Sequence, residues 1–130
     1  MNEALEFHDS DVQSVEAEGG CLTLRFSAAY IHRSAGQPGV DAGEGYLQAA
    51  QVLFRNADFV GNLSECVGTL YDGSIVVSGQ PLGLVPVPFI SPGPVRAEFL
   101  FNNGSSLRIE AASVSCSCYD RSEFVERFSA

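Results

Sequence analysis

The chain has 130 residues, 45% of them hydrophobic, and its 16 acidic and 7 basic residues give a net charge of −9. This composition predicts one folded domain, residues 1–130, with a hydrophobic core rather than a disordered chain. The negative charge argues against binding to nucleic acid or to anionic membranes, because both need basic residues. It is compatible with a basic protein partner.

The first predicted element is an antiparallel hairpin that turns at Gly19-Gly20. Apolar and polar residues alternate on both sides of this pair, and a two-residue loop matches their apolar faces. Residues that face each other then have numbers that sum to 39, so Val15 faces Leu24. A strict ladder would leave Val12 outside the core. We therefore expect a β-bulge near Val12, which also turns His8 and Ser10 inward.

In the middle of the chain, the positions of glycine and proline and the alternation of apolar with polar residues predict the loops and strands. A Gly-rich loop is expected over Ser34–Gly45. The pattern of Tyr46–Ala57 fits a helix and a strand equally well. Two short strands around Asp72-Gly73 are predicted within Gly68–Gly79. An edge strand with its prolines outward is predicted at Leu84–Ile90, because proline cannot donate to a ladder.

A second antiparallel hairpin is predicted over Val95–Cys118, where residues alternate on both sides of Asn102-Asn103-Gly104. A three-residue loop sets Phe99 against Leu107, and a two-residue loop would mix apolar with polar side chains on one face. The apolar phase changes near Ala111-Ala112, as a β-bulge would produce.

At the C-terminus, Asp120 and Glu123 could cap a short helix that carries Phe124, Val125 and Phe128, and a final strand explains the same residues. The whole pattern predicts an all-β fold. We expect an antiparallel sandwich or partly closed barrel of about 7–9 short strands, with or without the C-terminal helix.

The register of the first hairpin brings the two histidines of the chain into one corner. It places His8 opposite Ile31, Asp9 opposite Tyr30 and Phe7 opposite His32. The predicted binding residues in this corner are His8, Asp9, Ser10, Tyr30, His32, Arg33 and Ser34.

Several kinds of chemistry are compatible with these residue types. Two histidines and a carboxylate could bind a metal, but no HxH or HxxxH spacing is present. A Ser-His-Asp triad lacks the G-x-S-x-G turn, and neighbouring strand residues point to opposite faces. The corner could be a polar recognition patch beside the Gly-rich loop. The corner could instead be structural, with Asp9 as a cap or in a salt bridge with Arg33 and the histidines in ordinary hydrogen bonds.

Cys116 and Cys118 lie two residues apart and share a strand face, whereas Cys21 and Cys66 are isolated. Without a second ligand pair they are expected to act as small hydrophobic residues rather than as a metal or redox site. Dinucleotide and Walker motifs are absent, and the chain has no lysine. We therefore expect no cofactor.

Several segments resemble a group of small bacterial proteins of unknown function. They are Phe7-His8-Asp9-Ser10, residues 29–34 (AYIHRS), residues 36–43 (GQPGVDAG), Tyr71-Asp72-Gly73 and residues 124–128 (FVERF). The resemblance implies an all-β fold with a strand at residues 46–57, and it implies no activity. A similar F-H-D start occurs among toxin-immunity proteins.

The first residues carry Glu3 and Glu6 and no basic, apolar leader, and no stretch approaches the roughly 18 apolar residues of a membrane span. We therefore expect a cytoplasmic bacterial protein with reduced thiols. The leading functional hypothesis is a non-catalytic, immunity-like recognition module for a basic protein. The alternatives are a small-ligand-binding β-barrel, and a hydrolase or metal enzyme that uses His8, Asp9 and His32. A homo-oligomer is left open.

Overall fold

The computed structural model describes residues 1–129, which are built almost wholly from strands. The strands are β1 (Asn2–Glu18), β2 (Cys21–Ser34), β3 (Gly43–Arg55), β4 (Asp58–Val60), β5 (Gly68–Val77), β6 (Gln80–Leu82), β7 (Val85–Pro86), β8 (Phe89–Phe101) and β9 (Ser106–Phe128). One turn of 3-10 helix, η1 (Leu63–Glu65), precedes β5. In the described part of the chain, no helix has the length and apolar character needed to cross a membrane.

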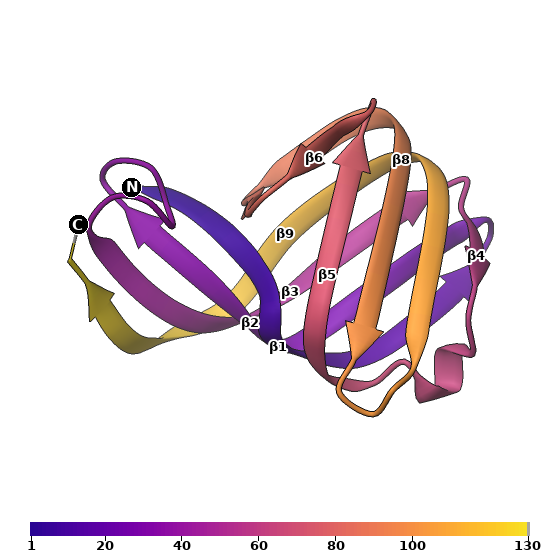
Figure 1. Cartoon of the computed structure of the whole chain (residues 1–130), viewed down its shortest axis with the longest axis horizontal. Coiled ribbons are helices and arrows are strands. Elements are labelled where there is room, and N and C mark those ends of the chain that lie inside the picture. The colour runs from indigo at the N-terminus through magenta and orange to yellow at the C-terminus, as the bar shows by residue number, and fades with distance from the viewer. Residues whose placement is uncertain (130) are drawn as a thin grey trace.

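The strands form one antiparallel sheet in the order β6-β5-β8-β9-β3-β2-β1-β7, with β4 added to β9 (Figure 1). The sheet curls until β5 also pairs with β1 through Asp11↔Thr69 and Val12↔Gly68. These two pairs join six strands into a ring. The fold is therefore all-β and partly closed, as the alternation predicts, although several strands are longer than expected.

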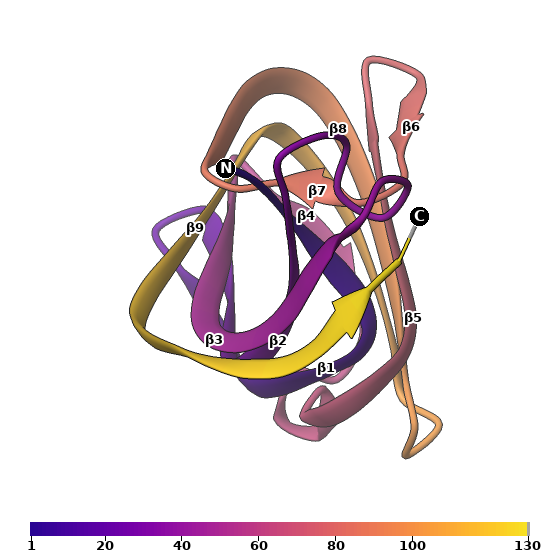
Figure 2. The same cartoon turned by 90° about the vertical axis from the view of Figure 1, so that its left-hand side faces the viewer.

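One end of the molecule is an extension of four strands. It contains residues 2–6 of β1, 29–34 of β2, 43–49 of β3 and 119–128 of β9, and it projects from the barrel body on the left of Figure 1. Figure 2 views these strands from that end, where they form a curved sheet. Its core face continues the barrel interior through Leu5, Ile31 and Tyr46, which lie opposite one another. We call the other face, which carries His32, the outer face.

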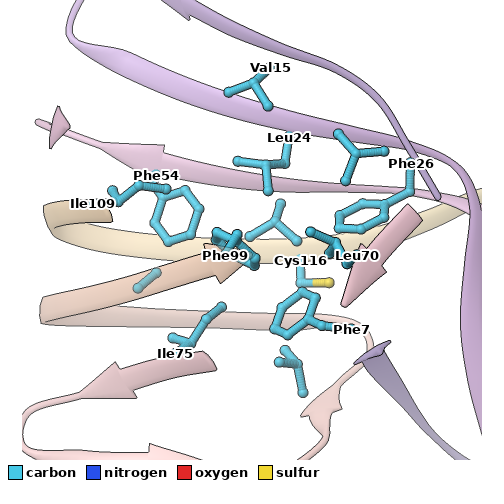
Figure 3. Close-up of a cluster of buried hydrophobic side chains, with 14 of the residues drawn as sticks. Phe7, Val15, Leu24, Phe26, Phe54, Leu70, Ile75, Phe99, Ile109 and Cys116 are labelled. Carbon is cyan, nitrogen blue, oxygen red and sulfur yellow. The ribbon is translucent and has the colours of Figure 1, made fainter. Parts of the chain in front are cut away.

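The barrel interior is filled by apolar side chains from most of the strands (Figure 3). Phe99 lies in the middle of this core, with its ring 5.0 Å from that of Phe7 and 6.4 Å from that of Phe54. Gly73 packs between Phe7 and Phe99, where a Cβ atom would come within 3.0 Å of both side chains. Large rings therefore meet across the barrel only because one strand contributes no side chain at that point.

Both predicted hairpin turns are confirmed. Ala17 faces Leu22 around Gly19-Gly20, and Phe99 faces Leu107 around the three-residue loop. The apolar phase changes after Ala111, also as predicted. The extra residue, however, lies on the opposite strand at Gly93-Pro94, where the β8–β9 register shifts.

Four segments either contradict the sequence-based expectations or decide between their alternatives. Residues 68–77 form the single strand β5, so the predicted turn at Asp72-Gly73 is wrong, and the chain only changes register between Leu70 and Asp72. The predicted edge strand at 84–90 is divided between the short edge strand β7 and the start of β8, with Pro86 and Pro88 exposed as expected. Residues 46–55 and 120–128 are strands rather than helices.

Candidate functional site

The predicted corner is organised by a bulge in β1. Residue numbers that face each other sum to 39 from the turn to Ser14↔Arg25. The register is irregular at Val12↔Phe26 and Asp11↔Ala28, and the sum is 36 from Glu6↔Tyr30 onward. The bulge is therefore confirmed, but it is larger than expected. His8 does not face Ile31, whose partner is Leu5. Ser10 and Val12 turn inward as predicted, whereas His8 remains exposed.

Ser10 replaces the ladder hydrogen bonds that the bulge removes. Its side chain is buried, and its Oγ donates to the Glu6 carbonyl at 2.6 Å and accepts from the Tyr30 N–H at 2.8 Å. Asp9, directly before it, has a φ of 67°, a conformation that Asp tolerates better than most residues. A small hydroxyl and a turn-forming residue thus let β1 skip residues while its backbone groups stay paired.

His8 links β1 to β5 at the place where these strands separate. Its Nδ1 lies 2.6 Å from the Tyr71 carbonyl oxygen and its Nε2 lies 3.4 Å from Asp9 Oδ2. Both neighbours accept hydrogen bonds, so the doubly protonated ring satisfies both. The hydrogen bond to the Tyr71 carbonyl raises the pKa of His8, and the charges of Asp9, Glu6 and Asp72 raise it further.

This geometry predicts a pH-dependent contribution of His8 to stability. Because its pKa is raised on folding, the contribution is complete below the unfolded value of about 6.5 and is lost as pH rises through the folded value. Urea unfolding of the wild type and of His8→Gln should therefore differ more at pH 6 than at pH 8.5. An NMR titration that placed the folded His8 pKa at or below its ordinary value would contradict this.

His32 and Tyr30 lie together on the outer face of the extension. His32 Nε2 is 2.6 Å from Glu6 Oε1, and its ring stacks on Phe128 with a centroid distance of 5.3 Å. The Tyr30 ring is 5.1 Å from that of His32, and the Tyr30 hydroxyl donates to Glu126 at 2.5 Å. Burial raises the pKa of Tyr30, as do the hydrogen bond to Glu126 and the charges of Glu126 and Glu6.

The Tyr30 ring occupies space that Gly45 leaves open on β3. A Cβ atom on Gly45 would collide with the Tyr30 hydroxyl oxygen and come within 2.7 Å of the ring. The glycine therefore lets Tyr30 lie across β3 and reach Glu126 on β9. This close approach explains one glycine of the Gly-rich region by packing rather than by loop mobility.

Four carboxylates connect these two histidine environments, and we call Glu6, Asp9, Asp72 and Glu126 the acidic band. Glu6 is the middle member, because its charge acts on Tyr30 together with Glu126 and on His8 together with Asp9 and Asp72. The pKa values of His8 and Tyr30 are both shifted upward. The largest cause of each shift lies outside the band, namely the Tyr71 carbonyl for His8 and burial for Tyr30, and the charges of the band raise both pKa values further. A surface with several carboxylates also attracts other cations.

The remaining predicted residues lie elsewhere. Arg33 points to the core face, where its Nη2 is 2.8 Å from Glu3 and its guanidinium carbon is 3.9 Å from the centroid of the Tyr46 ring. The predicted Asp9–Arg33 pair is therefore wrong. Ser34 is buried; its Oγ donates to the Ala42 carbonyl and accepts from the Gly36 N–H. Ser34 thus holds the β2–β3 loop, which is shorter than predicted.

A catalytic or metal-binding arrangement is not assembled from the described residues. The histidines contact different carboxylates, and the hydroxyls of Ser10 and Ser34 bind backbone groups instead of a histidine. Across residues 1–129 no group of three or more His, Cys, Asp or Glu is placed to hold a metal ion. The predicted neighbourhood of β1 and β2 exists, but its residues serve separate contacts.

Sequence reasoning missed Glu6, Asp72, Tyr71 and Glu126. Glu6 and His32 come together only after the three-residue shift of the bulge, and Glu126 is 96 positions from Tyr30. A local signal existed for Tyr71, Asp72 and Glu126, since all three belong to segments of the resemblance. No local pattern could assign Glu126 to the same surface, because its partner lies on another strand.

The cysteines are free thiols, and the described structure contains no disulfide. Burial raises the pKa of Cys116 to about 12 and that of Cys118 to about 11. Cys118 and Cys116 pack on the core side, as their two-residue spacing predicts. Burial thus disfavours the thiolate form of Cys116 and Cys118, which agrees with the prediction that they act as small hydrophobic residues.

Two hollows lie beside the β2–β3 loop. The larger, of about 680 Å³, runs between the N-terminal residues, the loop and the β6–β8 connection, with Pro38, Leu84 and Val87 on its walls. The smaller, of about 180 Å³, is bounded by His32, Arg33 and Ser34 on one side and by the loop and Phe128 on the other.

Comparison with known proteins found no match to a family model, to a curated protein or to a solved structure.

Proposed function

We propose that this chain is a non-catalytic recognition module that binds a basic segment of a partner protein through the acidic band. The observation that carries this proposal is how the charges are paired. Among the described residues, Glu3, Glu16, Glu44 and Glu98 each pair with an arginine. The four carboxylates of the acidic band instead contact histidine, tyrosine or backbone groups. Within residues 1–129, these four charges therefore stand without arginine partners on the surface that joins His8 and Tyr30.

The surroundings of the band suit arginine or lysine side chains. The Tyr71 side chain is exposed, at 61% of its maximum, and its ring lies 6.2 Å from that of His8. A guanidinium or ammonium group can stack on such a ring while a carboxylate binds its N–H groups. Immunity-like neutralisation of a basic toxin, as the F-H-D start suggests by analogy, is one form of this function.

Removing charge from the band should weaken binding to a basic probe. In Asp9→Asn/Asp72→Asn both side chains keep their size and hydrogen-bonding oxygen, and Asn tolerates the positive φ at position 9. We expect affinity for a synthetic deca-arginine peptide, measured by calorimetry at moderate salt, to fall about tenfold, since exposed charge contacts contribute up to about 1 kcal/mol each.

The matched control is Glu18→Gln/Asp58→Asn, which removes the same charge near the Gly19-Gly20 turn, where the Ala57 N–H donates to the Gly20 carbonyl. This variant should bind the peptide within about twofold of the wild type, because exposed charges beyond a Debye length are screened. Equal losses for the two variants would mean that binding follows net charge alone, and the proposal would fail.

A second candidate function is small-ligand binding, which the hollow of about 680 Å³ favours. Its volume lies within the usual range of ligand pockets, and its walls are largely apolar. NMR shift mapping distinguishes the two functions. The deca-arginine peptide should shift the signals of residues 6–9 and 71–72. An apolar probe such as Nile red would instead shift those of residues 37–40 and 83–87 if the larger hollow were the ligand-binding site.

A further inference from the structure

The C-terminal half of β9 has an unpaired edge. Residues up to Cys116 pair with β8 on one side, whereas in the described structure the pairs of residues 117–128 are with β3 alone. Figure 1 shows this segment, in yellow, at the rim of the extension. Tyr119, Phe124 and Val125 are exposed along it. Such an edge can pair with another strand.

The edge is irregular, which restricts the strands that fit it. Asp120 has a φ of 63°, and β9 carries two extra residues relative to β3 between Tyr119 and Glu123. Val125 is a further extra residue, because Phe124 and Glu126 face the adjacent residues Tyr46 and Gly45. Bulges of this kind block regular partner strands. A partner must carry irregularities at matching places.

The outer side chains of this edge complement their own reversed order. If two copies run antiparallel with Glu123 facing its own copy and Val125 bulged out of the ladder, residue numbers that face each other beyond the bulge sum to 247, and Glu123 with Glu123 is the single like-charged pair. Asp120 then faces Arg127, Arg121 faces Glu126, and Tyr119 faces Phe128. Each pair occurs twice in a two-fold arrangement, which gives four oppositely charged pairs and two aromatic pairs.

The bulge at Val125 makes the outer pairs geometrically consistent. Facing residues of an antiparallel pair share one side of the sheet. In a regular strand Tyr119 and Phe128, nine positions apart, would point to opposite sides. Here both lie on the outer face, opposite Ala49 and Gly43, because Val125 shifts the alternation by one. The irregularity that blocks a regular strand thus permits pairing with a second copy.

We propose that two copies of this chain associate through the edges of β9 over residues 119–128, in an antiparallel two-fold dimer. In the described structure Asp120 and Arg121 form no ion pair, so their charges are available. Arg127 contacts Glu44 and Glu126 accepts from Tyr30, and both groups have further hydrogen-bonding capacity. The proposal is independent of a basic partner.

Sedimentation equilibrium tests the pairing through charge exchange. The wild type should show a mass of twice 13.8 kDa at about 100 µM, as expected for a weak, small interface. Arg121→Glu opposes Glu126 with a like charge at two places, and Glu126→Arg opposes Arg121 in the same way. Each variant alone should dissociate about tenfold more readily.

An equimolar mixture of Arg121→Glu and Glu126→Arg should recover the wild-type dissociation constant, because both crossed pairs become attractive again. Arg55→Glu changes the net charge equally at the other end of β3 and should leave the dimer unchanged. Failure of the mixture to recover, or a wild type that stays monomeric up to about 1 mM, would overturn the proposal. Recovery also shows that the variants fold.

Discussion

Phe99→Ala is expected to lower the free energy of unfolding by about 3–5 kcal/mol, the usual cost of truncating a buried phenylalanine. The Phe99 side chain is 1% exposed and lies where the rings of Phe7 and Phe54 converge (Figure 3). Removing it leaves a cavity that Gly73 cannot help to fill, because glycine has no side chain to repack. A domain with a total stability of about 5–15 kcal/mol would lose a large fraction of it.

Chemical denaturation at constant pH measures this change, with Phe59→Ala as the control. Phe59 on β4 is 38% exposed and stands outside the core cluster. Its truncation should cost about 1 kcal/mol or less, because little apolar area is buried there. Equal losses for the two variants would mean that the barrel interior is not the main source of stability.

Ser10→Ala is expected to cost about 2–4 kcal/mol although it removes a single oxygen atom. The substitution leaves the Glu6 carbonyl and the Tyr30 N–H without the partner they have at the bulge. Each buried polar group that loses its hydrogen bond costs about 1–3 kcal/mol, and part of this is recovered where water reaches the Glu6 side.

Ser14→Ala is the control on the same strand, because the Ser14 hydroxyl makes only a long, exposed contact of 3.5 Å with Glu16. It should change stability by no more than about 0.5 kcal/mol. Hydrogen exchange gives a local readout, in which the Tyr30 amide should lose protection in Ser10→Ala and keep it in Ser14→Ala. A fully protected Tyr30 amide in Ser10→Ala would contradict the role assigned to the hydroxyl.

The two proposals place different demands on Glu126. It forms one end of the acidic band through Tyr30, and in the dimer it faces Arg121 of the second copy. The tests remain separable, because Asp9 and Asp72 lie on β1 and β5, away from the β9 edge. Dimerisation would also set two acidic bands in fixed positions, and a basic partner with two binding segments would then gain from bivalent attachment.

Local patterns in the sequence determined the hairpins and their registers. At Gly19-Gly20 and at residues 102–104, turn chemistry and alternation act over a few neighbouring positions, and a slip of one residue would expose the apolar face. The all-β class follows from the same alternation. The expected turn at Asp72-Gly73 failed because Gly73 serves packing between Phe7 and Phe99, which no local pattern records.

Only the tertiary structure decided the arrangement of the candidate site. The bulge of β1 shifts its pairing by three residues, so His32 binds Glu6, and His8 turns to Tyr71. The closure of β5 on β1 and the reach of Tyr30 to Glu126 join residues that are distant in the chain. The physical reason is that turns and alternation involve near neighbours, whereas bulge size and barrel closure depend on packing of the whole core.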